Sequence, residues 1–239
     1  MGDVPLASLS LTHVHYNPND PISYLCAWLA LIPQGLCVIY VTLMWATREA
    51  EIIMMFVGQM GCEVFNFLLK RLIKEKRPPQ MLGKGYGMPS SHAQFLAFFS
   101  VSLTLFLLFR HNSPATHASY SHSDTPTPLL LRVTVSTLVL MVAGLVAASR
   151  VYLNYHTPKQ VLVGCIAGVI SALGWFVATE YVRRTGFLQW ALEFQICRFF
   201  RLRDLVVEED LVEAGWQEWK LRIKRRRKMS NEHYPKKGE

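Results

Sequence analysis

Long apolar runs separated by short polar stretches dominate the chain from residue 24 to residue 180. Five runs are suited to crossing a bilayer, at residues 24–45, 50–69, 93–109, 129–148 and 159–180. A membrane-spanning helix needs about 20 mostly apolar residues. The third run is the shortest, and a helix that begins within residues 89–92 would lengthen it. The pattern therefore predicts an all-α polytopic membrane bundle of about five spanning helices.

Polar side chains interrupt the second run at a helical spacing. Gln59, Glu63, Asn66 and Lys70 recur every three or four residues and therefore share one helical face. Polar groups at this depth normally face a bundle interior or a water-filled cavity. We expect this face to point inward, with Glu63 and Asn66 bonding to other helices, or with Glu63 pairing with Lys70.

Small residues recur four apart in the last two runs. Gly164, Gly168 and Ala172 form one ridge, and Gly144 with Ala148 forms a shorter one. Because small side chains allow helices to approach closely in lipid, both ridges are predicted to be helix contacts.

Composition agrees with a membrane protein, and the distribution of charge orients it. Hydrophobic residues make up 51% of the chain and charged residues 18%, against about 25% charged in soluble proteins. Of the 25 Lys and Arg residues, 14 follow Tyr181, six lie at 70–84 and the first 47 residues contain none. Since Lys- and Arg-rich segments stay cytosolic, the tail is predicted to be cytosolic. No aromatic-basic recognition motif accompanies the charge, so nucleic acid is not expected as a partner.

Span counting then places the N-terminus and the loops 70–92 and 149–158 together on the opposite side. The basic residues of the 70–84 loop break the simple charge rule there, and phosphate binding would account for them. The chain divides into an N-terminal segment (1–22), a membrane-embedded domain (23–180) and a basic tail (181–239).

The remaining segments carry weaker signals. Residues 187–200 predict a helix lying in the membrane interface, and the basic run 220–228 suits an anionic membrane surface. Residues 110–128 are rich in Ser, Thr, Pro and His and predict a flexible, solvated loop rather than a metal site. The five cysteines show no paired spacing, so we expect free thiols.

Three polar stretches carry the candidate chemistry, and span counting brings all three to one membrane face. They are Lys70 with Arg77 and Pro78, the run Pro89-Ser90-Ser91-His92, and the run Ser149-Arg150 through His156 to Gln160. Phosphoryl transfer depends on positioning and on stabilising negative charge, which Arg forks, Lys ammonium groups and a helix N-terminus supply. Imidazole titrates near neutral pH, so one histidine can attack phosphorus while the other protonates the leaving oxygen.

The three stretches resemble the signature of the type 2 phosphatidic acid phosphatase (PAP2) family, written KxxxxxxRP, PSGH and SRxxxxxHxxxD. The resemblance covers roughly residues 60–180. Within the family, residues 85–95 and 149–160 and the N-terminal Leu-Thr-His-Val-His-Tyr are similar to dolichyl diphosphate phosphatases.

The resemblance implies a role for each matching residue and no metal or cofactor. His156 is the expected nucleophile, which forms a phosphohistidine, and His92 is the expected general acid. The phosphate oxygens are expected to be held by Lys70, Arg77, Arg150, Ser90 and the backbone N–H of Ser91.

Two residues depart from the family pattern. Ser91 replaces the usual Gly, which is harmless if only its N–H is used. Gln160 replaces an Asp that holds the nucleophilic His. Its carbonyl can fix the tautomer of His156, or Gln160 can simply complete a capping box with Thr157. Ser91 with Gln94 also fits a capping box.

The expected activity is hydrolysis of dolichyl diphosphate at the lumenal face of the endoplasmic reticulum, with the polyprenyl diphosphate lipid as the only substrate partner. Residues 236–239 resemble a dilysine signal read by the retrieval machinery of that compartment. Other lipid phosphates, or a catalytically dead membrane scaffold, are the alternatives. The histidines would then be structural, and the basic residues interfacial anchors.

Overall fold

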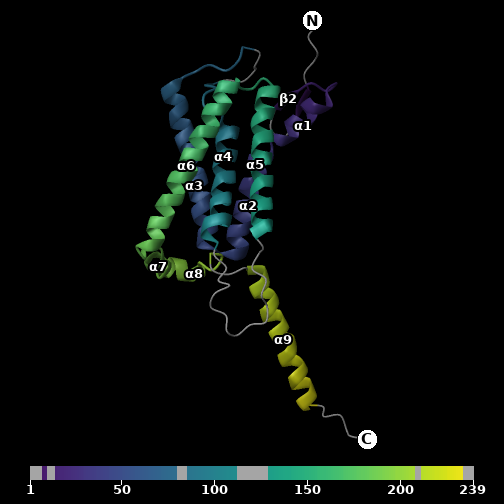
Figure 1. Cartoon of the computed structure of the whole chain (residues 1–239), viewed down its shortest axis with the longest axis vertical. Helices are drawn as coiled ribbons and strands as arrows, with labels where there is room; N and C mark the ends of the chain where they lie inside the picture. The colour runs from purple at the N-terminus through teal and green to yellow at the C-terminus, as the bar shows by residue number, and fades with distance from the viewer. Residues whose placement is uncertain (1–6, 10–13, 80–84, 112–128, 208–210, 234–239) are drawn as a thin grey trace.

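The computed structural model describes residues 7–9, 14–79, 85–111, 129–207 and 211–233, and its described part contains five helical stretches long and apolar enough to span a membrane (Figure 1). The fold is an all-α membrane bundle, as predicted. The spanning elements are α1 (Pro21–Leu29) with α2 (Ile32–Thr47), α3 (Ala50–Ile73), α4 (Ser91–Leu105) with the π-helix η1 (Phe106–Arg110), α5 (Leu129–Tyr152) and α6 (Pro158–Arg184).

The first predicted run is two helices rather than one. α1 ends at Leu29 and α2 starts at Ile32, with α1 inclined to α2 at the N-terminal end of the bundle (Figure 1). Pro33 sits in the first turn of α2. A proline has no N–H to donate, and its ring clashes with the carbonyl four residues earlier. The chain therefore breaks just before Pro33.

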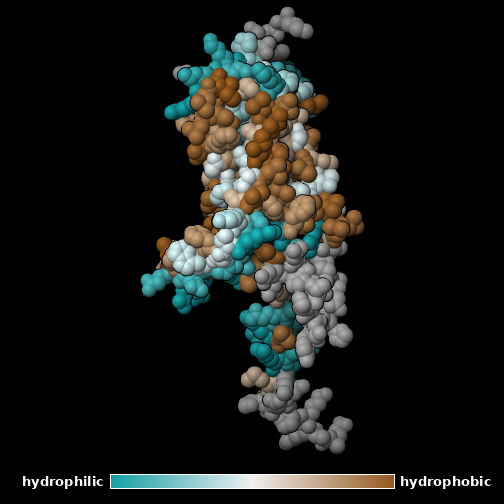
Figure 2. Space-filling view, turned by 60° about the vertical axis from the view of Figure 1, so that its left-hand side comes forward, coloured by the Kyte–Doolittle hydropathy of each residue, from teal (hydrophilic) through white to brown (hydrophobic). Residues whose placement is uncertain are grey.

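α4 is the most enclosed spanning helix and carries the core. Its residues Leu96 and Phe98 are each 1% exposed, and α4 packs against α3, α5 and α6. The face drawn in Figure 2 is mainly apolar between two more hydrophilic ends, and exposed large apolar side chains also occur along α2, α3, α5 and α6. An apolar surface of this kind is what a bilayer requires of a spanning protein.

The ridge on α6 lies in close contact with α4. A Cβ at Gly168 would lie 2.4 Å from the carbonyl oxygen of Gln94, and a Cβ at Gly164 2.7 Å from that of Ser90. The predicted contact at Gly164, Gly168 and Ala172 is therefore confirmed. The shorter ridge is wrong, because a Cβ at Gly144 would meet nothing within 4 Å.

The inward polar face of α3 is confirmed for two of its members. Gln59 donates to the carbonyl of Phe95 at 3.3 Å, and Asn66 donates to Gln94 Oε1 at 2.7 Å. Glu63 does neither of the things expected of it. Its Oε1 is buried with no hydrogen-bond partner among the described residues, and Lys70 donates to Ser91.

The two ends of the bundle differ. A short hairpin of β1 (Ala7–Leu9) and β2 (Val14–Tyr16), which the sequence did not predict, lies at the end where α3 finishes and α4 and α6 begin. The tail helices α7 (Phe187–Leu192), α8 (Gln195–Phe199) and α9 (Leu211–His233) lie at the other end (Figure 1). The described parts of the motif loops and of the N-terminal segment thus share one end, opposite the tail, as predicted. The single interfacial helix expected at 187–200 is two short helices.

A buried ionic cluster closes the tail end. Glu51, 2% exposed, accepts hydrogen bonds from Arg110 at 2.7 Å and Arg183 at 2.5 Å, and Arg183 also pairs with Asp204. The loop predicted at 110–128 is therefore wrong at its start: Arg110 ends the spanning helix, and His111 is buried against the carbonyl of Val206. The rest of that loop lies outside the described residues.

Candidate active site

A cavity of about 210 Å³ opens at the hairpin end and collects residues from all three motifs. Its walls come from α2, α4, α5, the two motif loops and β2: Val14, Ala30, Gln34, Arg77, Ser91, His92, Arg150, Tyr155 and His156. Side chains as far apart in the chain as Arg77 and His156 therefore face one space. The predicted convergence of the three motifs is what the structure shows.

Arg150 brings an uncompensated positive charge to this cavity. It is 2% exposed, and its Nη2 donates to the carbonyl of Cys26 at 3.3 Å. Its guanidinium carbon also lies 5.3 Å from the centre of the Tyr155 ring. Arg150 forms no salt bridge within the described part of the chain. A buried charge is costly unless it is paired, so an anionic ligand would be strongly favoured here.

Arg77 and Lys70 add to the positive field from the first motif. The Nε of Arg77 is buried with no hydrogen-bond partner among the described residues. Lys70, in the last turn of α3, donates to Ser91 Oγ at 2.5 Å. Ser91 Oγ in turn donates to Asn66 Oδ1 at 3.2 Å. Lys70 is thereby fixed against the start of α4, while Arg77 faces the same cavity.

The start of α4 differs from its predicted capping. The N-cap is Ser90, and Ser91 is the first helical residue. Gln94 turns away from the cap and donates to the carbonyl of Cys62 at 3.1 Å, so the capping box of Ser91 with Gln94 is wrong. The reason is tertiary, because Asn66 on α3 also donates to Gln94. Ser90 Oγ is buried with no hydrogen-bond partner among the described residues.

His156 is held in a tight turn between α5 and α6. Its backbone N–H and that of Tyr155 both donate to the carbonyl of Arg150, at 3.2 and 3.0 Å. The turn leaves the ring 6% exposed. Burial lowers the pKa of His156 to about 4; the hydrogen bond that His156 donates to Gln160 opposes that shift, and the charges of Arg77 and Lys70 add to it. The imidazole is therefore neutral at neutral pH, as a nucleophile must be.

Gln160 both orients His156 and caps α6, so the two alternatives left open by the sequence coexist. Its Oε1 lies 3.2 Å from His156 Nδ1 and accepts from the Thr157 N–H at 3.3 Å, while its backbone N–H donates to Thr157 Oγ1. Its Nε2 donates to Glu75 Oε1 at 3.0 Å and to the carbonyl of Lys76 at 2.9 Å.

These bonds decide the tautomer of His156. Because the amide nitrogen of Gln160 already faces two acceptors, its carbonyl must face the imidazole. Nδ1 of His156 is then the donor, and the lone pair lies on Nε2. The arrangement leaves Nε2 as the nitrogen able to attack an electrophile.

His92 lies in the first turn of α4, on the wall of the same cavity. Its Nε2 lies 3.2 Å from the carbonyl of Ala30. A carbonyl only accepts, so Nε2 carries a proton. The Nε2 proton of His92 is thus held by a backbone carbonyl, and Nδ1 is the nitrogen left to exchange a proton with a ligand, while His156 keeps its lone pair on Nε2.

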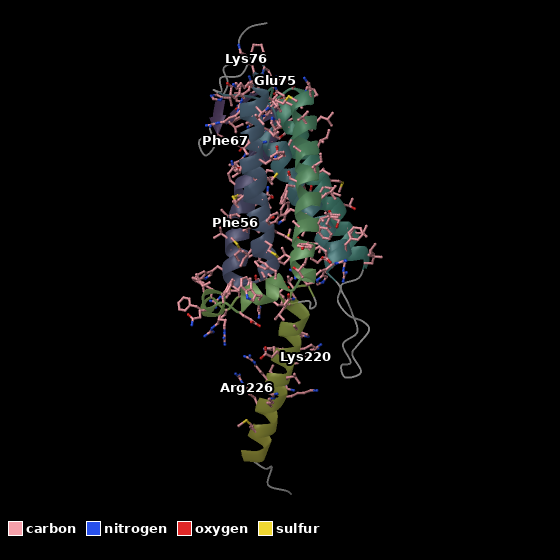
Figure 3. All side chains as sticks on the ribbon, turned by 90° about the vertical axis from the view of Figure 1, so that its left-hand side faces the viewer. Phe56, Phe67, Glu75, Lys76, Lys220 and Arg226 are labelled. Atoms are coloured by element: carbon pink, nitrogen blue, oxygen red, sulfur yellow. The ribbon has the colours of Figure 1, made fainter. Side chains whose placement is uncertain are left out.

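Sequence reasoning missed several contributors to the site. Glu75 and Lys76 lie beyond the end of α3, at the end of the bundle (Figure 3). The Glu75 carboxylate and the Lys76 carbonyl both accept hydrogen bonds from the amide nitrogen of Gln160. Gly87 has no room for a side chain, since a Cβ there would lie 2.9 Å from the Gln160 amide. The position of Glu75 inside the first motif was a usable signal. Val14 belongs to the N-terminal Leu-Thr-His-Val-His-Tyr stretch, whose resemblance was a usable signal although it assigned no role to this residue.

A second cavity, of about 270 Å³, adjoins the first. It shares the wall residues Gln34, Ser91 and His92 with the first cavity. Its other lining residues come from the membrane-spanning parts of α2, α3 and α4: Pro33, Cys37, Met60, Glu63 and Phe95. A largely apolar space within the membrane therefore continues from the polar one.

Comparison with known proteins gives a consistent family. The family model described as the PAP2 superfamily matches residues 51–184. A protein of Neurospora crassa is 50% identical over 93% of this chain and 95% of its own length. Dolichyldiphosphatase 1 of Homo sapiens is 40% identical over 82% of this chain and 81% of its own, and dolichyldiphosphatase of Saccharomyces cerevisiae is 30% identical over 86% of each. No solved structure matches.

Proposed function

The chain belongs to the PAP2 superfamily, and on that premise we propose that it hydrolyses dolichyl diphosphate to dolichyl phosphate and phosphate at the lumenal face of the endoplasmic reticulum. The reaction recycles the lipid carrier of protein N-glycosylation. The observation that carries the proposal is the single cavity in which His92, His156 and Arg150 meet.

The residues divide the reaction into two steps. Nε2 of His156 attacks the terminal phosphorus, an N–P bond forms, and the bond from phosphorus to the bridging oxygen breaks with its electron pair going to that oxygen. Because its Nε2–H faces the Ala30 carbonyl, His92 enters this step as an imidazolium, gives its Nδ1 proton to the departing dolichyl phosphate and becomes neutral. Water then attacks the phosphohistidine, and the electron pair of the N–P bond returns to Nε2. His92 accepts the proton of that water.

The cations lower the barrier of both steps. Negative charge spreads over the equatorial oxygens of the transferred phosphoryl group. Arg77 and Arg150 line the cavity that would hold those oxygens, and Lys70 reaches its wall through Ser91. Groups fixed before the substrate arrives need no reorganisation during reaction. Ser90 and the backbone N–H of Ser91 are proposed to complete the cradle at the start of α4.

The second cavity accounts for the lipid part of the substrate. It lies on the membrane side of the polar cavity and shares His92 with it. An isoprenoid chain attached to a diphosphate in the polar cavity would find apolar walls at Cys37, Met60 and Phe95. Burying that chain contributes binding free energy that a free phosphate compound lacks.

The proposed orientation of the protein in the membrane rests on the distribution of Lys and Arg. The tail end of the bundle carries α9 with its basic residues, including Lys220 and Arg226 (Figure 3), and the cavity lies at the other end. Lys- and Arg-rich segments stay in the cytosol, and this charge distribution supports the proposed lumenal orientation of the cavity. The dilysine-like residues 236–239, which would be read by the retrieval machinery, lie outside the described residues.

The test is phosphate release by the purified protein from a panel of lipids: dolichyl diphosphate, dolichyl phosphate, phosphatidic acid and a sphingoid phosphate. We expect dolichyl diphosphate to have the highest kcat/KM and EDTA to leave it unchanged. His156→Ala should lose about a thousandfold or more, whereas His111→Ala, at the far end, should retain kcat. Preference for another lipid would overturn the substrate, and full activity of His156→Ala would overturn the mechanism.

A further inference from the structure

Glu75 places a carboxylate behind the amide that holds the proposed nucleophile. Glu75 Oε1 accepts from Gln160 Nε2 at 3.0 Å, and Gln160 Oε1 lies 3.2 Å from His156 Nδ1. The three groups form a chain of two hydrogen bonds, carboxylate to amide to imidazole. The same amide is fixed from a second direction by the carbonyl of Lys76.

The proposed reaction creates a positive charge that the nearest group cannot neutralise. When Nε2 of a neutral imidazole bonds to phosphorus while Nδ1 keeps its proton, the ring becomes a cation. Gln160, its direct partner, offers only a carbonyl dipole. The charges of Arg77 and Lys70 act on His156 and oppose a further cation there, and Arg150 lines the same cavity. A negative charge in line with Nδ1 would offset that opposition.

We infer that Glu75 is a positioning residue that supplies this negative charge to His156 through the Gln160 amide. The carboxylate polarises the amide N–H, and the amide carbonyl becomes a stronger acceptor for Nδ1–H, because hydrogen bonds in a chain strengthen one another. The inference rests on the proposed function for its phosphorylated intermediate, and on the hydrogen bonds from Gln160 to Glu75 and from His156 to Gln160 for its geometry.

Two features of Glu75 agree with this role. The hydrogen bond from Gln160 lowers the pKa of Glu75, so the carboxylate stays ionised throughout the neutral range. Gly87 allows the arrangement, since it donates its N–H to the carbonyl of Glu75 at 2.8 Å and leaves the amide of Gln160 its space. The loop between the first two motifs thereby holds carboxylate and amide in register.

A different role for Glu75 would be a surface ion pair. Lys159 Nζ lies 3.4 Å from Glu75 Oε2, and its side chain is 71% exposed. Exposed pairs of this kind contribute little stability. The two roles differ in what they predict for Lys159→Met, which removes the pair but leaves the chain through Gln160 intact.

The experiment exchanges the two groups. Glu75→Gln removes the charge at nearly constant shape, Gln160→Glu places two carboxylates face to face, and the double variant E75Q/Q160E restores one of each with the charge now beside the imidazole. Lys159→Met is the matched control. Each protein is assayed for kcat, KM and the pH profile on dolichyl diphosphate and on farnesyl diphosphate, a shorter lipid that needs the same phosphoryl transfer.

The expected result is a tenfold or greater loss of kcat in each single variant, at little change in KM, with Lys159→Met like wild type. The double variant should be more active than Gln160→Glu, which is the sign of coupling between neighbouring groups. Its acidic limb should move to higher pH, because an adjacent carboxylate favours protonated imidazole. In Glu75→Gln the acidic limb should move to lower pH, because loss of a carboxylate disfavours protonated imidazole. A merely structural role of Glu75 would leave the limb of this single variant at its wild-type pH.

The decisive measurements use whichever diphosphate the wild type hydrolyses. On that substrate, wild-type kcat in Glu75→Gln would overturn the inference, and so would a double variant that is less active than both single variants. Failure of the proposed substrate is a separate outcome: the wild type would then hydrolyse farnesyl diphosphate and leave dolichyl diphosphate intact.

Discussion

The contact between α6 and the start of α4 sets the spacing of the two histidines, and Gly164 is the residue that permits it. A Cβ at this position would lie 2.7 Å from the carbonyl oxygen of Ser90 and 3.3 Å from Ala93 Cβ. Ser90 also donates its N–H to the carbonyl of Gln160 at 3.1 Å. The helix carrying His92 is thus anchored to the helix that follows His156.

Gly164→Ala must push these helices apart. Ordinary contact for a Cβ begins at 3.4 Å, so the backbone at Ser90 has to move by about 0.7 Å, since backbone cannot rotate away as a side chain would. Overpacking of this kind destabilises by about 1–3 kcal/mol. A displacement approaching 1 Å between reacting groups lowers the rate by about 10- to 100-fold. We therefore expect kcat to fall by that factor.

The assay is phosphate release together with thermal unfolding of the purified protein in detergent. Gly174→Ala is the matched control, on the same helix, where an added Cβ meets nothing within 4 Å. It should keep wild-type kcat and unfolding temperature. If Gly164→Ala also keeps wild-type kcat, the α4–α6 contact does not control the spacing of the histidines.

Three further predictions follow from the geometry. Cys37→Trp should fill the second cavity and raise KM for dolichyl diphosphate about tenfold, with little effect on KM for a short-chain diphosphate. Val38→Trp, at an outward position that is 67% exposed, should leave both KM values unchanged. Equal increases of KM in the two variants would contradict binding of the lipid chain in the second cavity. Burial lowers the pKa of His156 to about 4, so the ring stays neutral well below neutral pH. We expect kcat/KM to stay constant as the pH falls from neutral and to drop only near pH 4. Loss of kcat/KM near the ordinary histidine pKa of 6.5 would mean that the ring is exposed. Glu51→Gln should lower the free energy of unfolding of the protein by about 3 kcal/mol, while kcat per folded molecule is retained. An unfolding experiment that finds unchanged stability would mean that the ionic cluster does not stabilise the fold.

Much of the fold was determined by the sequence alone. Apolar runs of bilayer length specify spanning helices directly, because each helix satisfies its own backbone in lipid. The distribution of Lys and Arg placed the tail opposite the motif loops, and span counting alone brought Lys70, His92 and His156 to one end. These are properties of single segments, so they can be read without knowing the neighbours.

Other features were decided by the contacts between segments. Periodicity shows which face of a helix is polar, but the partner of a polar group depends on the register of the neighbouring helix. Gln94 therefore bonds to α3 instead of capping α4, and Arg110 ends in a buried cluster instead of a loop. Glu63 faces a cavity although its spacing suggested a bonded partner.

The site shows the same division most clearly at Gln160. The sequence by itself determined that an amide follows His156 at a distance of one helical turn, where it can reach the imidazole or cap α6. Only the tertiary structure decided that it does both, because the loop held by Gly87 brings Glu75 and Lys76 against its amide nitrogen. The side-chain amide of Gln160 then makes four hydrogen bonds, two through its oxygen and two through its nitrogen, and only one orientation of the amide satisfies them. That orientation fixes which nitrogen of His156 carries the lone pair.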